Sequence, residues 1–175
     1  MNPEAHKAIE DAWVALVRIR ALCPSATEDA IDTEIYQSPP FYREHGMNFI
    51  VKLDGPLTSE GLALLKEMTA FINRSFFIVM AAILEAHDLA VRDNIPNGAG
   101  DGRDHALLVK WLRNRFAHAE FMYDPNEQKH VETRQLLEEL IPKTKEAAYQ
   151  GFFPAAINVV LEPLKDGVLR YIDAS

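Results

Sequence analysis

The sequence has one cysteine, Cys23, among its 175 residues. A single cysteine excludes an internal disulfide and any zinc site built from several cysteines. Cysteine usage this low fits a reducing compartment. A chain of this length buries roughly two thirds of its unfolded surface on folding, so its core needs no disulfide or metal ion to stabilise it. We therefore expect neither a metal nor a cofactor.

The sequence also lacks a long apolar run and a basic leader. Its longest uncharged stretch, residues 147–161, contains Pro154 and Asn158, and it is shorter than the about 20 apolar residues that cross a membrane. Residues 1–11 are polar and acidic, whereas a secretory signal starts with basic residues. These features predict a cytoplasmic protein with no membrane contact.

Basic residues are outnumbered, with 18 Lys and Arg against 26 Asp and Glu, which gives a net charge of −8. Broad binding of duplex DNA depends on many cationic contacts to phosphates, so we expect no DNA partner. The stretch 110–118 differs, because Lys110, Arg113 and Arg115 lie in it without an acidic residue. A small site for an anion can therefore form there on an acidic protein.

Helical periodicity dominates the chain, which shows neither an internal repeat nor a low-complexity stretch. Apolar residues recur at spacings of three and four, and cap residues such as Asn2 precede them. The expected helices span Pro3–Leu22, Thr58 or Ser59 to Val91, Arg103–Met122, Glu127–Ile141 and Ala155–Ile172. Consecutive helices joined by loops predict an all-α fold, an antiparallel bundle of four to five main helices. We expect one domain over residues 1–175.

The longest expected helix carries the clearest core pattern. The residues expected to form its buried stripe are Leu62, Leu65, Met68, Ile72, Phe76, Val79, Ile83 and Ala86. Their spacings of three and four place them on one helix face. Further apolar residues broaden the stripe, so the middle of this helix is expected to be buried on several sides.

Two other stretches are irregular. Residues 24–57 form an excursion, in which Thr27–Tyr36 could make a short acidic helix and Asn48–Leu53 could be extended. Residues Asp93–Gly102 are rich in turn residues and predict a loop. Its glycines resemble those of a phosphate-binding loop, but no Gly-Lys-Ser/Thr follows and no strand precedes. We therefore expect a flexible loop there rather than a phosphate site.

The helix over residues 103–122 contains an unusual stripe. At about 100° per residue, His118, Trp111 and Asn114 all fall within roughly 40° of Leu107. Arg115 falls near 80°, at the edge of the same face. Burying an amide or an imidazole without partners costs roughly 1–3 kcal/mol. These polar groups therefore pair with one another, face a partner chain or line a pocket.

Arg113 falls about 140° away from His118 on an ideal helix. The two side chains can meet only if Arg113 curls round the helix, if the helix end distorts, or if a second copy of the chain brings them together. In the simplest structural interpretation they never meet. Arg113 and Lys110 then belong to a solvated face, and His118 is a satisfied histidine near a helix C-terminus, where cations are favoured.

The segment Arg113-Asn114-Arg115-Phe116-Ala117-His118 resembles the signature of the HEPN superfamily, in which Arg is followed after four to six residues by His and often directly by Asn. The predicted bundle, with a long apolar helix before the motif, is similar to that family too. The excursion at 24–57 has no counterpart that we can map.

The resemblance implies a metal-independent endoribonuclease that acts as a homodimer. Such proteins occur in toxin–antitoxin, antiphage and RNA-processing systems, so an antitoxin protein is an implied partner if the chain is a toxin. Other members have lost catalysis and only bind RNA, nucleotides or proteins. Carried onto this chain, the catalytic residues are Arg113, Asn114 and His118, and Lys110 and Arg115 add phosphate contacts.

The implied chemistry suits these residue types. RNA carries its own nucleophile, the 2′-hydroxyl, beside the scissile phosphate. A histidine such as His118 can move the proton near neutral pH, and an arginine such as Arg113 can hold the phosphate and stabilise developing charge. Asn114 would orient them. The product would be a 2′,3′-cyclic phosphate.

Two other classes of function fit the same residues. The chain could be a noncatalytic helical module that binds RNA or a protein, with Arg113, Asn114 and His118 structural at a dimer interface. It could also be an enzyme that acts on a nucleotide in the helical cleft. Substitution of His118 or Arg113 separates the ribonuclease from the noncatalytic module. Loss of cleavage with unchanged stability indicates an enzyme, and loss of stability indicates a structural role.

Overall fold

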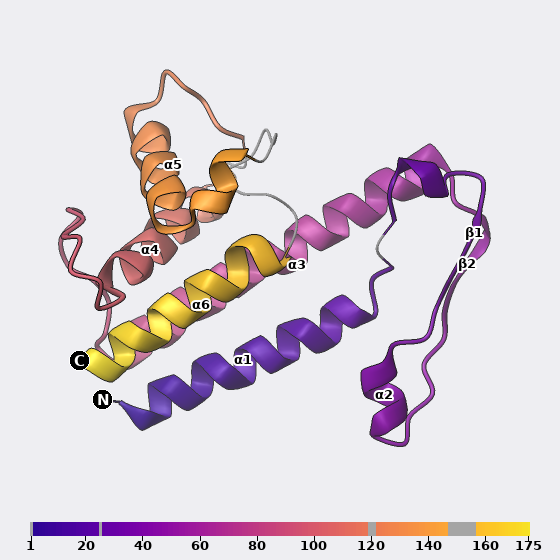
Figure 1. Ribbon diagram of the computed structural model, residues 1–175, viewed down its shortest axis with the longest axis horizontal. Helices are drawn as coiled ribbons and strands as arrows, with labels where there is room; N and C mark the ends of the chain where they lie inside the picture. The colour runs from indigo at the N-terminus through magenta and orange to yellow at the C-terminus, as the bar shows by residue number, and fades with distance from the viewer. Residues whose placement is uncertain (1, 25, 119–121, 147–156) are drawn as a thin grey trace. The chain divides into compact units, whose positions relative to one another are not determined.

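The computed structural model describes residues 2–24, 26–118, 122–146 and 157–175. These residues are mostly helical and contain six α-helices and one two-stranded sheet. The chain divides into two compact units, one of Met1–Trp13 with Asn73–Ser175 and one of Val14–Ile72. Helices α1 (Pro3–Ala21) and α3 (Ser59–Ala86) contribute to both units (Figure 1).

The first unit contains α4 (Arg103–Ala117), α5 (Gln128–Leu140) and α6 (Ile157–Ala174), together with the last part of α3 and the first part of α1. Figure 1 shows α4 beside α5 and α6. A short 3-10 helix, Pro142–Glu146, follows α5. Ten buried residues of α4 and α6 supply much of the core: Ala106, Leu107, Leu108, Val109, Leu112, Val160, Leu161, Leu164, Val168 and Ile172.

Glycine allows α4 and α6 to approach closely. Gly102, at the start of α4, has φ +88°, and a Cβ there would lie 2.0 Å from the carbonyl oxygen of Gly167. A Cβ on Gly167 would lie 2.1 Å from ring atoms of His105. Burial in this contact lowers the pKa of His105, and Arg170 lowers it further, although the Asp104 carboxylate opposes both. The fold therefore favours the neutral imidazole of His105.

Polar contacts cap α1 and join its first part to α6. The Asn2 side chain caps α1 by accepting a hydrogen bond from the backbone N–H of Ala5 at 3.1 Å, as predicted. The Lys165 ammonium lies 3.5 Å from Glu10 and 5.3 Å from the centre of the Trp13 ring. Burial alone lowers the pKa of Lys165, but the carboxylates of Asp166 and Glu10 outweigh it and raise that pKa.

The part of α3 in the first unit turns a different face inward from the one predicted. Its buried residues are Asn73, Phe76, Phe77, Met80, Ala81 and Leu84, a regular helical stripe. Of the predicted stripe only Phe76 is buried here, and Val79 is 42% exposed. Phe77, Met80 and Leu84 are among the further apolar residues expected to broaden the stripe, and their burial confirms that part of the prediction. The main stripe was wrong in this part of α3, because apolar residues surround the helix and periodicity alone does not show which of them face the core. Aromatic contacts at 5.6 and 5.7 Å join Phe76 to Trp13 and Phe77 to Phe116.

The second unit corrects the predicted all-α class. Strands β1 (Glu34–Gln37) and β2 (Val51–Pro56) form an antiparallel sheet, so the fold is a helical bundle with a small hairpin. Exposure alternates along both strands, with Ile35 and Leu53 turned toward a cluster of Leu57, Leu62 and Leu65. Such alternation is the pattern of β-strands, in which successive side chains point to opposite faces of the sheet.

The predicted helix over Thr27–Tyr36 was therefore wrong. A 3-10 turn, Glu28–Ala30, precedes β1 instead. A short helix does occur in this region, but it is α2 (Pro40–Glu44), between the strands. The extended stretch predicted at Asn48–Leu53 is confirmed in part, because β2 begins at Val51.

Several helix ends match their sequence signals. Thr58 caps α3 by accepting a hydrogen bond from the N–H of Gly61 at 3.0 Å. The same helix ends earlier than predicted, at Ala86, because Asp88 adopts a left-handed conformation with φ 57°. The N–H of Leu89 then bonds the carbonyl of Leu84 at 2.8 Å, the pattern of a Schellman end. The predicted start of the last helix, Ala155, lies outside the described residues.

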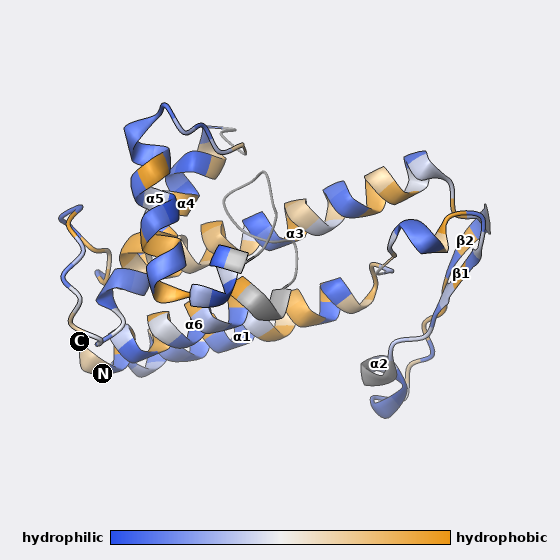
Figure 2. Cartoon of the chain, turned by 45° about the horizontal axis from the view of Figure 1, so that its top comes forward, coloured by the Kyte–Doolittle hydropathy of each residue, from blue (hydrophilic) through white to orange (hydrophobic). Residues whose placement is uncertain are grey.

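One helix among the described residues, α3, is long and apolar enough to span a membrane by length and composition alone. A third of its most apolar stretch is buried in the fold. Figure 2 shows hydrophilic and hydrophobic bands alternating along α3. Core helices pass the same criterion, so this is weak grounds for a membrane segment.

Candidate functional site: a groove between α4 and α5

The predicted motif occupies the last turns of α4. Arg113, Asn114 and Arg115 lie within the helix, and His118 is its C-cap. The backbone N–H of His118 donates to the carbonyl oxygens of Arg115 and Asn114 at 3.1 and 3.3 Å. These bonds fix the backbone of His118 at the helix end, where the residue is exposed.

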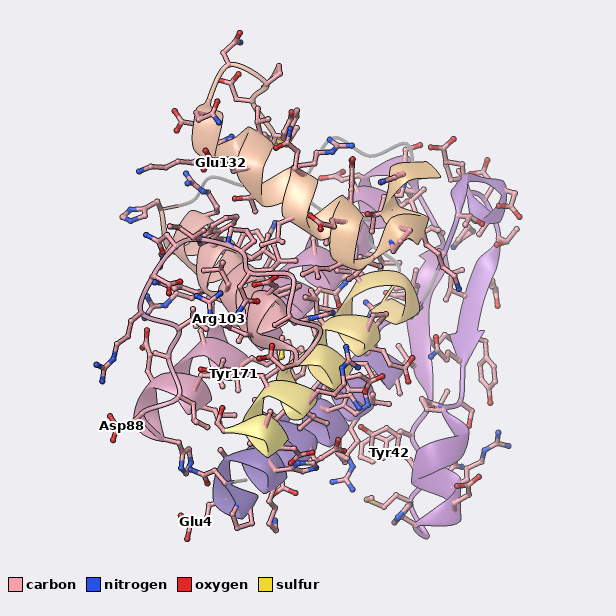
Figure 3. The ribbon with its side chains drawn as sticks, turned by 60° about the vertical axis from the view of Figure 1, so that its left-hand side comes forward. Glu4, Tyr42, Asp88, Arg103, Glu132 and Tyr171 are labelled. Atoms are coloured by element: carbon pink, nitrogen blue, oxygen red, sulfur yellow. The ribbon has the colours of Figure 1, made fainter. Side chains whose placement is uncertain are left out.

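A groove lies beside this helix end in the first unit. It is a cavity of about 580 Å³ lined by Asn94, Trp111, Asn114, Arg115, His118, Lys129, Glu132 and Thr133. Three of these residues lie in α4 and His118 is its C-cap, three others come from α5, and Asn94 comes from the loop after α3. Figure 3 labels Glu132 on α5 and Arg103 at the start of α4, the two helices whose side chains form the groove walls.

The predicted stripe of α4 is confirmed. Trp111, Asn114 and His118 line the same cavity, and Arg115 lines it as well. Leu107, the first residue of the stripe, is fully buried. Of the three arrangements that the sequence left open for the polar end of the stripe, the structure thus shows a pocket.

Arg113 lies on another side of α4. Its Nη2 pairs with the Glu85 carboxylate of α3 at 3.0 Å, and its Nη1 donates to Asn114 Oδ1 at 3.1 Å. Arg113 and Asn114 line a separate, smaller cavity of about 150 Å³ together with Glu85 and Lys110. Arg113 does not curl toward His118, so within one chain the two signature residues line different cavities. Asn114 lines both.

Lys110 makes contacts within its own chain. Its ammonium donates to the backbone carbonyl of Val91 at 2.8 Å, and the carbonyls of Arg92 and Asp93 lie at 3.3 and 3.4 Å. These contacts fix the chain where it leaves α3. The predicted phosphate role of Lys110 would require this ammonium to leave three carbonyl oxygens.

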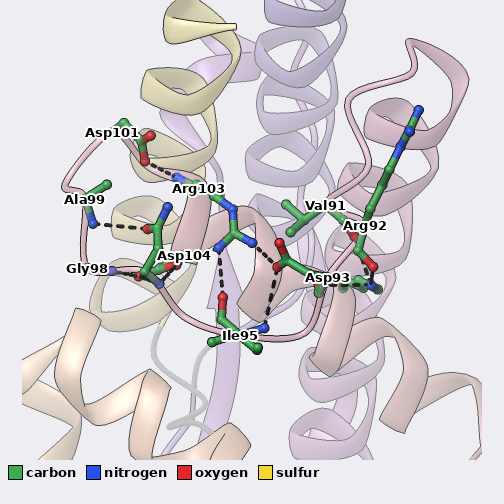
Figure 4. A network of polar contacts seen from close by, with 11 residues as sticks. Val91, Arg92, Asp93, Ile95, Gly98, Ala99, Asp101, Arg103 and Asp104 are labelled. Atoms are coloured by element: carbon green, nitrogen blue, oxygen red, sulfur yellow. Dashed lines mark hydrogen bonds and ion pairs between the residues drawn. The ribbon is translucent and has the colours of Figure 1, made fainter.

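The glycine-rich loop folds onto a buried carboxylate that the sequence analysis had not singled out. Asp104 accepts hydrogen bonds from the backbone N–H groups of Asn97 and Gly98, the shortest of them at 2.7 Å (Figure 4). The carboxylate takes the place that a phosphate would occupy in a phosphate-binding loop, so these N–H groups are not open to an anion. The available signal was an acidic residue, Asp104, two positions after the last glycine of the loop.

Arg103 completes this loop. Its guanidinium pairs with Asp93 and donates to the carbonyl oxygen of Ile95 at 3.0 Å (Figure 4). The loop is thereby held at both ends, and Asn94 lies between the two anchored residues. Since Asn94 lines the groove, Arg103 fixes the chain on both sides of one of the groove residues.

The groove combines three chemical abilities. Arg115 and Lys129 supply positive charge, His118 supplies a group that can carry a proton, and Trp111 supplies an aromatic face. Glu132 is the acidic member of this lining, and its Oε1 accepts a hydrogen bond from Gln128 at 2.8 Å. Among the residues the structure describes, no cluster of three His, Cys, Asp or Glu side chains could hold a metal ion. An anionic ligand that carries an aromatic ring fits this set of side chains.

Comparison of the chain with known protein families gives no matching family, and comparisons with curated proteins and with solved structures give no match either. The resemblance to the HEPN superfamily therefore rests on residues 113–118 and on the helical bundle, without a matching family or protein beside it.

Proposed function

We propose that the chain is a HEPN-like endoribonuclease that cleaves RNA without a metal in the groove between α4 and α5. One observation carries the proposal: a histidine, an arginine and an asparagine from the end of α4 line one cavity together with a tryptophan. Each group matches a need of RNA cleavage, since the substrate offers a proton to move, a phosphate to bind and bases that stack.

His118 and Arg115 have separate roles in this reaction. His118 accepts the proton of the 2′-hydroxyl, the 2′-oxygen forms a bond to phosphorus, and the bond from phosphorus to the 5′-oxygen breaks. The leaving 5′-oxygen takes a proton from water, which gives a 2′,3′-cyclic phosphate and a free 5′-hydroxyl. Arg115 binds the nonbridging oxygens, where negative charge grows in the transition state.

Arg113 acts through its neighbour in this scheme. By donating to Asn114 Oδ1, it leaves the amide N–H donors of Asn114 available to the groove. Arg113 is therefore a positioning residue within one chain, and the phosphate contact passes to Arg115. This assignment differs from the one that the family resemblance implies, in which the first arginine of the motif binds phosphate.

A homodimer belongs to the same proposal, and mixing variants tests whether it completes the site. If the partner's Arg113 served the His118 of one chain, Arg113→Ala protein would be as inactive as His118→Ala protein, and a mixture of the two would regain activity. If Arg113 acts only within its own chain, Arg113→Ala protein keeps about a tenth of the wild-type rate and mixing restores nothing. A role as a toxin or antiphage component in the cytoplasm is also part of this proposal. Its test is expression, which would be poor for wild type and normal for His118→Ala.

The direct test is incubation of total cellular RNA with purified protein in EDTA. Wild type is expected to give discrete fragments with cyclic phosphate ends, and His118→Ala to give none. His87→Ala is the matched control, because His87 lies at the end of α3 and lines none of the cavities described here. Intact RNA in every lane, with all proteins folded, would contradict the proposal.

A noncatalytic binding module is the second candidate, and one observation favours it. The Arg113 guanidinium already has a carboxylate partner, Glu85, at 3.0 Å. In that case Arg113→Ala would lower the melting temperature as much as Glu85→Ala does, and RNA would bind without being cut. Equal stability of Arg113→Ala and wild type would argue against it.

A further inference from the structure

The groove continues into a cavity of different chemistry. This second compartment, of about 330 Å³, shares Asn94, Trp111 and Glu132 with the first. Its remaining lining is Ile95, Pro96, Gln135, Leu136 and Glu139. All of these residues belong to the first unit, and the three shared residues join the two compartments into one groove along α5.

The two ends of this groove differ in charge. The first holds Arg115, Lys129 and His118, whereas the second holds Glu139 and no basic residue, with Glu132 at the junction. A phosphate is attracted to the first end and repelled from the second. A nucleotide bound here is thus oriented, with its phosphate beside His118 and its base toward Glu139.

The second compartment has the form of a base site. Trp111 lies at the junction and offers a ring for stacking, a contact that RNA-binding proteins use for unpaired bases. Ile95, Pro96 and Leu136 make the remaining wall apolar. Gln135 and Glu139 lie three and seven residues after Glu132, so α5 presents all three on one face.

We propose that this compartment selects guanine, an inference that rests on the proposed function of the groove. A carboxylate accepts two hydrogen bonds side by side, and only guanine among the four RNA bases offers two adjacent donors, N1–H and N2–H, on its Watson–Crick edge. The Gln135 amide N–H can donate to the neighbouring O6. Uracil, cytosine and adenine each place an acceptor next to their donor, and that acceptor meets the carboxylate unfavourably.

The proposal assigns the reading of the base edge to Glu139. Glu139 lines the second compartment and not the first. Glu132 lines both, and one of its oxygens already accepts from Gln128. Glu139 is therefore a specificity-determining residue and takes no part in the proton transfer at His118.

Binding of uncleavable RNA tests the assignment. Short 2′-O-methyl oligouridines with one central guanine, adenine, cytosine or inosine lack the nucleophilic hydroxyl, so their affinity is measured without reaction. The guanine oligonucleotide is expected to bind at least tenfold more tightly than the adenine one. Inosine, which lacks N2–H, is expected to lose about tenfold relative to guanine, the size of one lost hydrogen bond to a charged group.

Variants complete the test. Glu139→Gln is expected to reduce guanine affinity about tenfold and to leave adenine affinity unchanged, whereas Glu162→Gln, an exposed residue of α6, leaves both unchanged. Equal affinity for guanine and adenine in wild type, or a preference that survives Glu139→Gln, would overturn the guanine assignment and leave the proposed function standing. Failure of folded wild type to bind any of the four oligonucleotides would overturn both.

Discussion

Two sides of α4 carry the polar residues of the stretch 110–118, and the residues on one side make different contacts from those on the other. On one side Lys110 and Arg113 contact groups of their own chain, namely three backbone carbonyls after α3 and the Glu85 carboxylate. On the other, Arg115 and His118 line a groove of about 580 Å³ with an aromatic wall. Asn114 lies at the boundary and lines the cavities of both sides.

The difference shows how helical periodicity divides a linear motif. Arg113 and Arg115 are two residues apart, so they point in directions about 200° apart and cannot serve the same cavity. Arg115 and His118 are three residues apart and share a face. A motif defined as Arg followed by His thus selects, in this chain, two residues on different faces, and the intervening Arg115 is the one beside the histidine.

The largest expected effect is on the rate of RNA cleavage, and it distinguishes the two arginines. Arg115→Ala should slow RNA cleavage by roughly 10²-fold, the usual loss when a donor to a developing charge is removed. Arg113→Ala should slow it about tenfold, because only the orientation of Asn114 is lost. Single-turnover rates in EDTA measure both, with Arg92→Ala as a control outside the groove lining. A larger loss for Arg113→Ala than for Arg115→Ala would reverse the roles assigned here.

A smaller effect is expected on the side of α4 away from the groove. Lys110→Met keeps the apolar stem and removes the ammonium that holds the chain after α3. We expect a loss of about 1–2 kcal/mol in the free energy of unfolding and unchanged RNA affinity. Thermal melting and anisotropy with a short RNA measure the two quantities. Weakened RNA binding at unchanged stability would instead support the phosphate contact predicted from the sequence.

The smallest expected effect concerns pH and the start of α4. Because the fold lowers the pKa of His105 below its ordinary 6.5, the neutral imidazole contributes stability above that pH, and the contribution is lost as pH falls through the lowered pKa. The melting temperature of wild type should therefore fall on acidification more than that of His105→Gln. The same slope in both proteins would contradict this. Any pH dependence of cleavage that persists in His105→Gln belongs to the groove.

Much of the first unit was predictable because its signals are local. The cap at Asn2, the loop at 93–102 and the helix at 127–141 follow from short-range hydrogen bonding and periodicity, and the structure has them at or within a few residues of the predicted positions. The cap at Thr58, in the second unit, was predictable in the same way. The stripe of Trp111, Asn114 and His118 was predictable for the same reason, since it depends on helix geometry alone.

The remaining features depend on residues far apart in sequence. The hairpin of the second unit pairs Tyr36 with Lys52, and nothing near either residue indicates its partner. The pairing of Arg113 with Glu85 spans 28 positions, so the sequence could not show that this arginine had a carboxylate partner. Lys129 and Glu132 were not singled out either, because only the packing of α5 on α4 places them at the groove.

The two tryptophans of the chain provide the most direct test of the central claim, that RNA binds in the groove beside α4. Trp111 lines the groove, whereas Trp13, on α1, contacts Lys165 of α6 and Phe76 of α3. Titration of uncleavable guanine-containing RNA into nitrogen-15-labelled protein should move the indole N–H signal of Trp111 and leave that of Trp13 in place. Movement of the Trp13 signal alone, or of neither while RNA is bound, would contradict the claim.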